Sequence, residues 1–310
     1  IDDEAQREIK ASYPEIFAKC MATAGSFMHE FDPRSAMEVS PEERLEQYER
    51  LWAEPGFKKW LSNFYDVMMP GEANEDYAEF FRNKIRERVH DPLVAEMLVP
   101  KDHPFGSKRL PCETGYYDVF NRDDVLLVDV REAPIERIIP KGIQTSGAEY
   151  ELDVIIFATG YDAGTGSLTR IDIRGEGGQT IKDKYAGGPR NYMGLQSVGF
   201  PNLFIMPGAG AGNFTRGCEP LVEWVTDCID YMRENEFKHI SATPEAEEAW
   251  TEYVAEASAN LLRTKADSWF VGANIPGKAR VLLGSPDSAP IARAKRAQVA
   301  ANGYEGFLLR

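Results

Sequence analysis

The chain has 310 residues, a formal net charge of -15 at pH 7, four cysteines and four histidines. This length exceeds what one hydrophobic core usually supports, so we expect two or more domains. The acidic balance argues against nucleic acid or a membrane as a partner, because phosphate groups attract concentrated Lys and Arg. Widely spaced cysteines and few histidines argue against a metal site, and no signal-peptide pattern or long apolar run is present. We therefore expect a soluble, cytoplasmic protein.

The first third of the chain has helical character. Residues 1–104 are rich in Glu, Arg, Ala and Leu, and Ser40 followed by Pro41 and two acids is typical of a helix start. Aromatic and apolar residues recur there at helical steps, which indicates packing in a core: Trp52, Phe57, Trp60, Leu61 and Phe64. We interpret 1–104 as a helical subdomain. Because the opening at Ile1 reads like the middle of a helix, we also expect the chain to be a fragment.

Short strands are predicted next. Residues 125–130 and 135–139 have strand-like composition, Pro140 to Gly142 suit a turn, and Ile143 and Tyr150 lead into a more apolar run.

That run, Asp153 to Tyr161, reads Asp-Val-Ile-Ile-Phe-Ala-Thr-Gly-Tyr. It has the length and the β-branched content of a parallel strand that is covered on both faces. Gly160 would let a backbone or a ligand approach closely. The pattern predicts a buried strand that ends beside a ligand, and it equally fits a core strand followed by an ordinary turn.

The remaining elements are a glycine-rich stretch at 175–178, a strand at 203–206, a loop at 208–212 and a helix. Pro220 suits the first turn of this helix. Its buried face is predicted to hold Leu221, Val222, Trp224, Val225, Cys228 and Ile229. The loop Gly208-Ala-Gly-Ala-Gly-Asn213 approaches the dinucleotide-binding pattern Gly-x-Gly-x-x-Gly, but Asn213 occupies its sixth position, and the sequence holds no complete copy.

Segments along the whole chain carry a resemblance to one enzyme family. The string from Phe157 to Tyr161 is similar to the segment that links the nicotinamide and flavin domains of flavin-dependent monooxygenases. The other similar segments lie at 105–110, 191–194, 200–204, 219–224, 268–277 and 303–307. Together they resemble the C-terminal part of a Baeyer–Villiger monooxygenase.

The resemblance implies an α/β fold, namely part of a flavoprotein with two Rossmann-like domains, one for FAD and one for NADPH, and a helical insertion. Residues 1–104 would form the helical subdomain, residues 105–152 the C-terminal half of the NADPH-binding domain, and residues 153–310 the C-terminal part of the FAD-binding domain. The N-terminal glycine loops of both domains would lie upstream of Ile1. Without them we expect the chain alone neither to retain FAD nor to turn over.

The implied activity is NADPH- and O₂-dependent conversion of a small ketone to an ester or lactone. FAD and NADPH are the expected cofactors, and we expect the complete enzyme to be a monomer that includes the upstream N-terminal segment.

The resemblance assigns specific roles in the reaction and in cofactor binding to Arg109 and Lys108. Arg109 aligns with the active-site arginine of the family, and Lys108 with a residue that binds the 2′-phosphate of NADPH. Oxygenation by a flavin passes through negatively charged oxygen species, which a permanent, delocalised guanidinium stabilises. Taken without the resemblance, an adjacent Lys and Arg are also typical of a solvated surface.

The resemblance places four further groups near the cofactors. Trp269 aligns with an indole that donates to the nicotinamide ribose when a loop closes, although a single Trp is often core packing. Ala158, Thr159 and Gly160 would contact the cofactors through their backbone. Asn213 and the start of the following helix would face the flavin, because a helix N-terminus favours negative charge.

Two other interpretations remain open. One is an N- or S-oxygenating flavin monooxygenase, which shares the Ala-Thr-Gly string. The other is a non-catalytic acidic α/β interaction module derived from such an enzyme.

Overall fold

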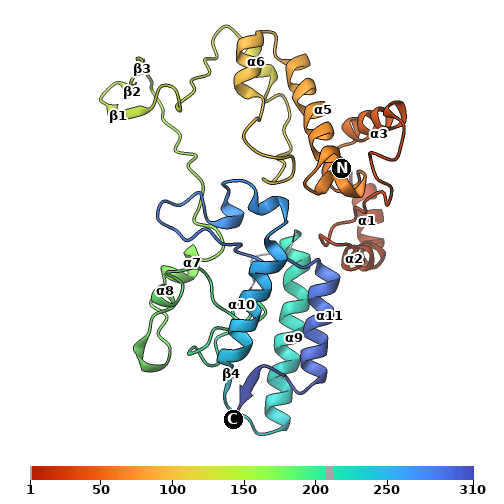
Figure 1. Ribbon diagram of the computed structural model, residues 1–310, viewed down its shortest axis with the longest axis vertical. Coiled ribbons are helices and arrows are strands. Elements are labelled where there is room, and N and C mark those ends of the chain that lie inside the picture. The colour runs from red at the N-terminus through yellow and green to blue at the C-terminus, as the bar shows by residue number, and fades with distance from the viewer. Residues whose placement is uncertain (1, 207–211) are drawn as a thin grey trace.

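The computed structural model describes residues 2–206 and 212–310, and this part of the chain is mainly helical (Figure 1). The helices are α1 Asp3–Ala11, α2 Tyr13–Ala22, α3 Pro41–Ala53, α4 Lys58–Leu61, α5 Glu72–Arg88, α6 Pro92–Leu98, α7 Gly166–Thr169, α8 Ile181–Lys184, α9 Phe214–Glu234, α10 Pro244–Ser258 and α11 Ala289–Ala301. Short 3₁₀ turns are η1 Tyr65–Met68, η2 Asp118–Asn121, η3 Glu176–Gly178, η4 Leu262–Thr264 and η5 Trp269–Val271. The strands are β1 Ile135–Ile139, β2 Gly142–Thr145, β3 Glu149–Glu151, β4 Ile240–Ala242 and β5 Phe307–Leu309.

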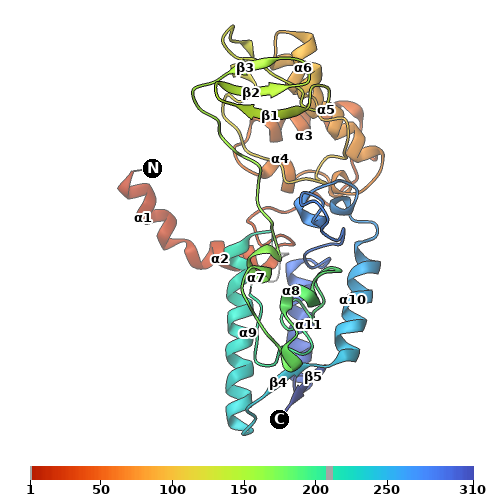
Figure 2. The ribbon, with the colours of Figure 1, turned by 90° about the vertical axis from the view of Figure 1, so that its left-hand side faces the viewer.

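Helices α3 to α6 form the upper part of the molecule (Figures 1 and 2). Helix α3 begins as predicted, because the Ser40 hydroxyl accepts a hydrogen bond from the backbone N–H of Glu43 at 3.2 Å and Pro41 takes the first position. The aromatic stripe packs there, with Phe64 fully buried and Trp52 against the same cluster. Helix α1 projects away from this body and buries none of its residues (Figure 2).

Strands β1, β2 and β3 form an antiparallel sheet at the outer edge of the upper part. Ile139 pairs with Gly142 across the tight turn, and Ile143 pairs with Tyr150, so the strand predicted at 135–139 and the turn after it are confirmed. The strand predicted at 125–130 is wrong. This segment has no ladder partner among the described residues, and Leu126 is 72% exposed.

The predicted buried strand at Asp153 to Tyr161 is also wrong. The segment is extended but unpaired within the described residues, and it descends from β3 toward α7 (Figure 2). Ile156 is 84% exposed and Tyr161 is 88% exposed. A strand needs the hydrogen bonds of neighbouring strands, and a buried strand also needs cover on both faces. The sequence contains the apolar residues of such a strand, while the described part of the chain provides neither neighbours nor cover.

The predicted strand at 203–206 has no ladder partner among the described residues either. Its backbone is held by other contacts, in which the N–H of Ile205 donates to the carbonyl of Leu195 at 2.8 Å and the N–H of Leu203 donates to the carbonyl of Phe200 at 3.4 Å.

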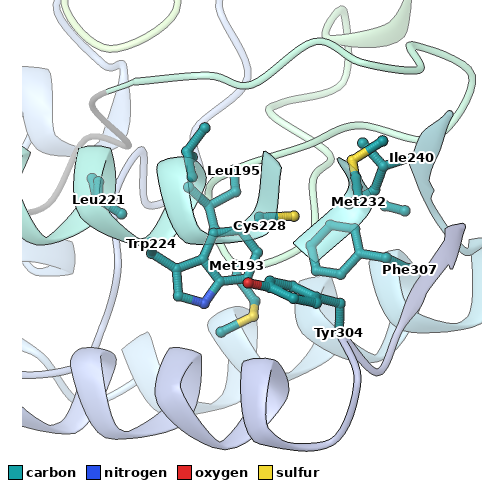
Figure 3. Packing of buried hydrophobic residues seen from close by; sticks show 11 residues of the cluster. Met193, Leu195, Leu221, Trp224, Cys228, Met232, Ile240, Tyr304 and Phe307 are labelled. Atoms are coloured by element: carbon teal, nitrogen blue, oxygen red, sulfur yellow. The ribbon is translucent and has the colours of Figure 1, made fainter. Parts of the chain in front are cut away.

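Helices α9, α10 and α11 form the lower part, with α9 and α11 side by side in both views (Figures 1 and 2). Their core gathers Trp224 and Cys228 of α9 with Tyr304 and Phe307 near the C-terminus (Figure 3). The indole N–H of Trp224 donates to the carbonyl of Arg296 at 2.9 Å, which ties α9 to α11.

The buried face of α9 is largely as predicted, with two exceptions. Val222 and Ile229 are exposed, because each lies roughly 100° around the helix from Leu221 or Cys228, beyond the edge of the buried face. Pro220 is not in the first turn. The helix begins at Phe214, so Pro220 lies inside it.

Across the described residues, none of the helices is both long enough and apolar enough to cross a bilayer.

Candidate active site

The loop that carries Lys108 and Arg109 is anchored to the helical part of the chain. The buried Asn74 side chain on α5 donates to the carbonyl oxygen of Phe105 at 2.8 Å. The Ser107 hydroxyl, also buried, donates to the carbonyl three residues before it at 2.6 Å. A buried amide that satisfies a loop carbonyl is costly to remove. These contacts fix the backbone immediately before the two cations.

Gly106 belongs to the same loop, and the Met68 side chain occupies the place that a Cβ would take there. Its φ is 78°, and a Cβ there would lie 2.6 Å from the terminal methyl of Met68 and 3.6 Å from the indole nitrogen of Trp60. That indole N–H is buried and has no hydrogen-bond partner among the described residues. A buried donor without a partner is rare in proteins and is available to a ligand that reaches it.

Lys108 and Arg109 line one cavity, the Arg109 cavity, of about 290 Å³. The aromatic rings of Phe105 and Tyr117 contribute to its wall. The Lys108 side chain is half-buried, whereas Arg109 is exposed and its guanidinium lies over the Phe57 ring. The described residues offer neither cation a carboxylate partner. Two adjacent cations without counter-ions beside an apolar wall suit a ligand that carries both phosphate and rings.

A carboxylate near this cavity responds to the positive charge. His103 bonds to Asp102 at 2.6 Å, and this hydrogen bond, with a further contribution from the Lys108 ammonium, holds the pKa of Asp102 below its usual range. Lys108 therefore lies close enough to influence Asp102 but forms no ion pair with it.

Ala158, Thr159 and Gly160 lie on the exposed extended segment described above. Gly160 has a φ of 84°, and no atom lies within 4 Å of the position that a Cβ would take. The peptide that follows is fixed, because the side-chain amide of Asn274 donates to the carbonyl of Tyr161 at 2.9 Å. The backbone of this segment is thus accessible and held at one end.

Trp269 begins the short turn η5, which Ser268 caps by accepting from the N–H of Phe270 at 3.3 Å. The Trp269 side chain is 38% exposed, and its indole N–H has no partner among the described residues. Gly272 closes the turn in the left-handed conformation. This Trp is therefore half-exposed on a loop and does not belong to a core cluster.

The loop after Trp269 is tied to the segment after Gly160. Lys278 donates to the Asp162 carboxylate at 2.5 Å and to the carbonyl of Ala163 at 3.0 Å. Asn274 makes the second link, to Tyr161. The structure thus brings together the two segments that carry Trp269 and Thr159.

Asn213 is the N-cap of α9. Its side-chain oxygen accepts from the N–H of Arg216 at 3.4 Å and from the hydroxyl of Thr215 at 3.0 Å, and its own N–H donates to the carbonyl of Gly25 at 3.0 Å. The first residues of the predicted glycine loop, 208–211, lie outside the described residues.

The sequence identified the segments around Arg109, Thr159 and Trp269, but it did not indicate which side chains would connect them. The described residues show no contact that joins Arg109 to Thr159 or to Trp269. Asn274, Lys278 and Asp162 were missed, although Asn274 lies within the conspicuous 268–277 segment. Phe57 was interpreted only as core packing. No group of metal-ligating side chains occurs in the described part of the chain.

Comparisons with known proteins link the chain to oxygenases, although no family model matches it. It is 44% identical over 313 residues to a 2-oxo-Δ³-4,5,5-trimethylcyclopentenylacetyl-CoA monooxygenase of Pseudomonas putida, which covers 99% of this chain and 57% of that protein. It is 40% identical to a Baeyer–Villiger monooxygenase of Pseudooceanicola batsensis, over 91% of this chain and 52% of that protein. A phenazine N-monooxygenase of Lysobacter antibioticus is 37% identical, over 89% of this chain and 51% of its own length.

The solved structures that are similar in fold also include monooxygenases. The crystal structure of OTEMO in complex with FAD and NADP superposes with a TM-score of 0.94 at 44% identity and covers 100% of this chain and 58% of its own. The closed crystal structure of cyclohexanone monooxygenase has a TM-score of 0.94 at 39% identity, covering 100% and 59%. The chain thus has the α/β fold of the matching part of these flavoproteins and spans somewhat more than half of their length.

Proposed function

We propose that the chain is part of a Baeyer–Villiger monooxygenase, an FAD- and NADPH-dependent enzyme that oxidises ketones to esters or lactones. In that reaction a ketone, O₂, NADPH and a proton give the ester, water and NADP⁺. Because the chain spans 57% of a matching relative, the activity is proposed for the protein that also contains the remaining part. The observation that carries the proposal is the pair of cations, Lys108 and Arg109, without carboxylate partners in one cavity.

The residues present fit both cofactors. Uncompensated cations suit the phosphates of FAD and NADPH, the buried indole N–H of Trp60 lacks a partner among the described residues, and the open space beside Gly160 admits a ligand at the backbone. When bound, NADPH supplies two electrons and the flavin carries the oxygen that is transferred.

Within this proposal, Arg109 remains protonated and presents N–H donors to negative charge that develops on the ketone oxygen. The face of the Phe57 ring holds the guanidinium in place. Lys108 attracts the 2′-phosphate of NADPH as a point charge. The loop with Trp269 covers the reacting groups and keeps water away, and Asn274 and Lys278 hold that loop against the Thr159 segment.

The same proposal assigns a role to each of the three parts of the chain. Residues 1–104 shape the substrate entrance, residues 105–152 belong to the NADPH-binding domain, and residues 153–310 belong to the FAD-binding domain, whose Asn213 cap starts a helix toward the flavin. The extended apolar segment around Ile156 would then pair with strands of the remaining part of the protein. The described chain by itself is expected not to retain flavin.

A direct product analysis tests the activity. The complete enzyme, supplied with NADPH and O₂, should convert cyclopentanone or cyclohexanone to the lactone with one NADPH consumed per product. A second candidate, N-oxygenation, is favoured by the similarity to the phenazine N-monooxygenase. Formation of a phenazine N-oxide without any lactone would select this candidate, and the absence of both products would favour a non-catalytic module.

A further inference from the structure

A second cavity, the Arg296 cavity, lies between helices α9, α10 and α11 and has a volume of about 140 Å³. Since about 10–15 Å³ of such space holds one water, it has room for several waters or a small organic group. One wall is apolar and includes Leu221, which also belongs to the core in Figure 3, and Trp250. Three arginines line it as well: Arg216, Arg293 and Arg296.

The carboxylates near this cavity already have partners. Asp287, which lines it, accepts from the Tyr253 hydroxyl and from the Lys295 ammonium, whose nitrogen lies 3.0 and 3.1 Å from the two carboxylate oxygens. Arg216 forms an ion pair with Glu219. These carboxylates are hydrogen-bonded to other groups, although the charge of Asp287 also acts on Arg296 from a distance.

Arg293 and Arg296 are the two cations left over. Arg293 donates to the neutral carbonyl of Met21, and the guanidinium of Arg296 has no hydrogen-bond or ion-pair partner among the described residues. They lie three positions apart on α11, so their like charges repel. Burial, and then this repulsion, lower the pKa of Arg296. In a chain with a net charge of -15, such a pair of cations is unusual, and an anion would relieve it.

Ser26, which also lines the cavity, provides an independent observation. Its side chain is 1% exposed and lines the cavity, and its hydroxyl has no hydrogen-bond partner in the described part of the chain. Its φ is 58°, a left-handed conformation that residues other than Gly seldom adopt. A strained residue with a buried, unsatisfied donor is typical of a binding site.

Two chains of contacts connect the cavity with the residues of the proposed active site. Phe27, next to Ser26, packs edge-on against Phe57 with ring centroids 5.5 Å apart, and Arg109 lies over the same Phe57 ring. On the other side, the N–H of Leu283, a lining residue, donates to the carbonyl of Phe270 at 2.9 Å, next to Trp269. The walls of the cavity are thus packed against both segments that carry the proposed chemistry.

We propose that the Arg296 cavity binds the carboxylate of an acidic ketone substrate, with Arg293 and Arg296 as its cationic partners and the Ser26 hydroxyl as a further donor. This substrate class rests on the proposed ketone oxidation. The planar fork of a guanidinium matches a carboxylate, and the apolar wall suits the carbon ring that carries it. A small inorganic anion would leave that wall unused.

A matched pair of substrates tests the proposal in the complete enzyme, namely 2-oxocyclopentaneacetate and its uncharged methyl ester. The acid should have the higher kcat/KM. In Arg296→Gln the ratio of the acid to the ester should fall by about tenfold or more, as expected for the loss of a hydrogen bond to a charged group. Arg233→Gln, at an exposed arginine on α9, is the control and should keep the wild-type ratio. An unchanged ratio in Arg296→Gln overturns the proposal.

Ser26→Gly is a second variant, because Gly adopts the left-handed backbone freely and removes the hydroxyl together with its Cβ. The acid-to-ester ratio should fall here too, by a smaller factor. A ratio equal to that of the wild type would remove Ser26 from the site.

Calorimetric titration of the FAD-loaded enzyme with the acid, without NADPH, separates this proposal from the proposed function. If the acid binds the wild type but not Arg296→Gln, and no ketone gives a lactone, the cavity is assigned correctly and the reaction is wrong. If cyclopentanone gives its lactone while the acid binds no better than its ester, the reaction stands and the cavity assignment is overturned. Displacement of the acid by an equal concentration of inorganic phosphate also overturns it.

Discussion

The guanidinium carbon of Arg109 lies 5.5 Å from the centroid of the Phe57 ring. Phe57 precedes α4 in the helical part, and Arg109 follows the loop that Asn74 anchors, so two segments far apart in the chain meet at this contact. The face of an aromatic ring attracts a cation without neutralising it. Phe57 therefore orients Arg109 and leaves its charge available to a ligand.

Replacement of Arg109 by Ala should abolish product formation while both cofactors still bind. Loss of one donor to a developing oxyanion typically costs about 3–4 kcal/mol in the transition state, which corresponds to roughly a hundredfold to a thousandfold in kcat. Lactone formation from cyclohexanone, with flavin content measured in parallel, checks this. Arg109→Lys is the matched control, since it keeps the charge but loses the planar fork, and it should recover only part of the activity. Normal turnover by Arg109→Ala would remove this residue from the mechanism.

Lys108→Ala should shift the cofactor preference from NADPH toward NADH. The ammonium would contact only the 2′-phosphate, so kcat/KM with NADPH should fall by about tenfold or more, while the value with NADH changes little. Steady-state kinetics with both cofactors give the ratio. Lys101→Ala is a control at an exposed lysine that pairs with Glu96 and should leave the ratio unchanged. Equal losses with the two cofactors would contradict the assignment.

The elements that the sequence predicts well are those determined by local chemistry. The start of α3 follows from Ser40 and Pro41, and the turn between β1 and β2 follows from the adjacent residues Pro140 to Gly142. Helix α9 shows the limit of such signals. Pro220 suggested a start, but Asn213 caps the helix earlier, and the helix continues through Pro220 with one backbone hydrogen bond fewer.

Elements that depend on distant partners were not predictable from composition. The apolar residues around Ile156 predicted a buried strand, yet a strand exists only where neighbours complete its hydrogen bonds, and the described chain provides none. The contacts within the candidate site could not be predicted for the same reason. The resemblance singled out Arg109 and Trp269, but the contacts with Phe57 and the links through Asn274 join segments whose meeting no local pattern indicates.

Trp269→Ala should uncouple NADPH consumption from product formation. The loop of Trp269 covers the proposed site, and a truncated side chain admits water, which diverts oxygen to hydrogen peroxide. The measurement is the ratio of hydrogen peroxide to lactone at saturating NADPH. Trp52→Phe changes a tryptophan of α3, outside this loop and outside both cavities, and serves as the comparison. Coupling equal to that of the wild type in Trp269→Ala would indicate that the side chain only packs.

The stability of the lower part should depend on a buried ion pair between α8 and α10. Lys184 donates to Glu247 at 2.6 Å, and the second carboxylate oxygen accepts from the N–H of Val198 at 2.8 Å. Both side chains are almost fully buried. Removal of one partner of such a pair leaves an uncompensated charge inside the protein, so Lys184→Ala should lower the free energy of unfolding by about 3–5 kcal/mol.

Urea denaturation of the complete protein, followed by circular dichroism, gives this value, and two further variants separate its causes. Lys141→Ala removes an exposed cation, 77% accessible, that pairs with Glu151, and should change the free energy by less than about 0.5 kcal/mol. In the double variant Lys184→Met with Glu247→Gln no buried charge remains, so much of the lost stability should return. If Lys184→Ala unfolded at the same urea concentration as Lys141→Ala, the carboxylate of Glu247 would have to be satisfied by another group. Arg190, whose Nε lies 3.7 Å from it, is the nearest candidate, and the double variant Lys184→Ala with Arg190→Ala would then unfold at a lower urea concentration than Lys184→Ala alone.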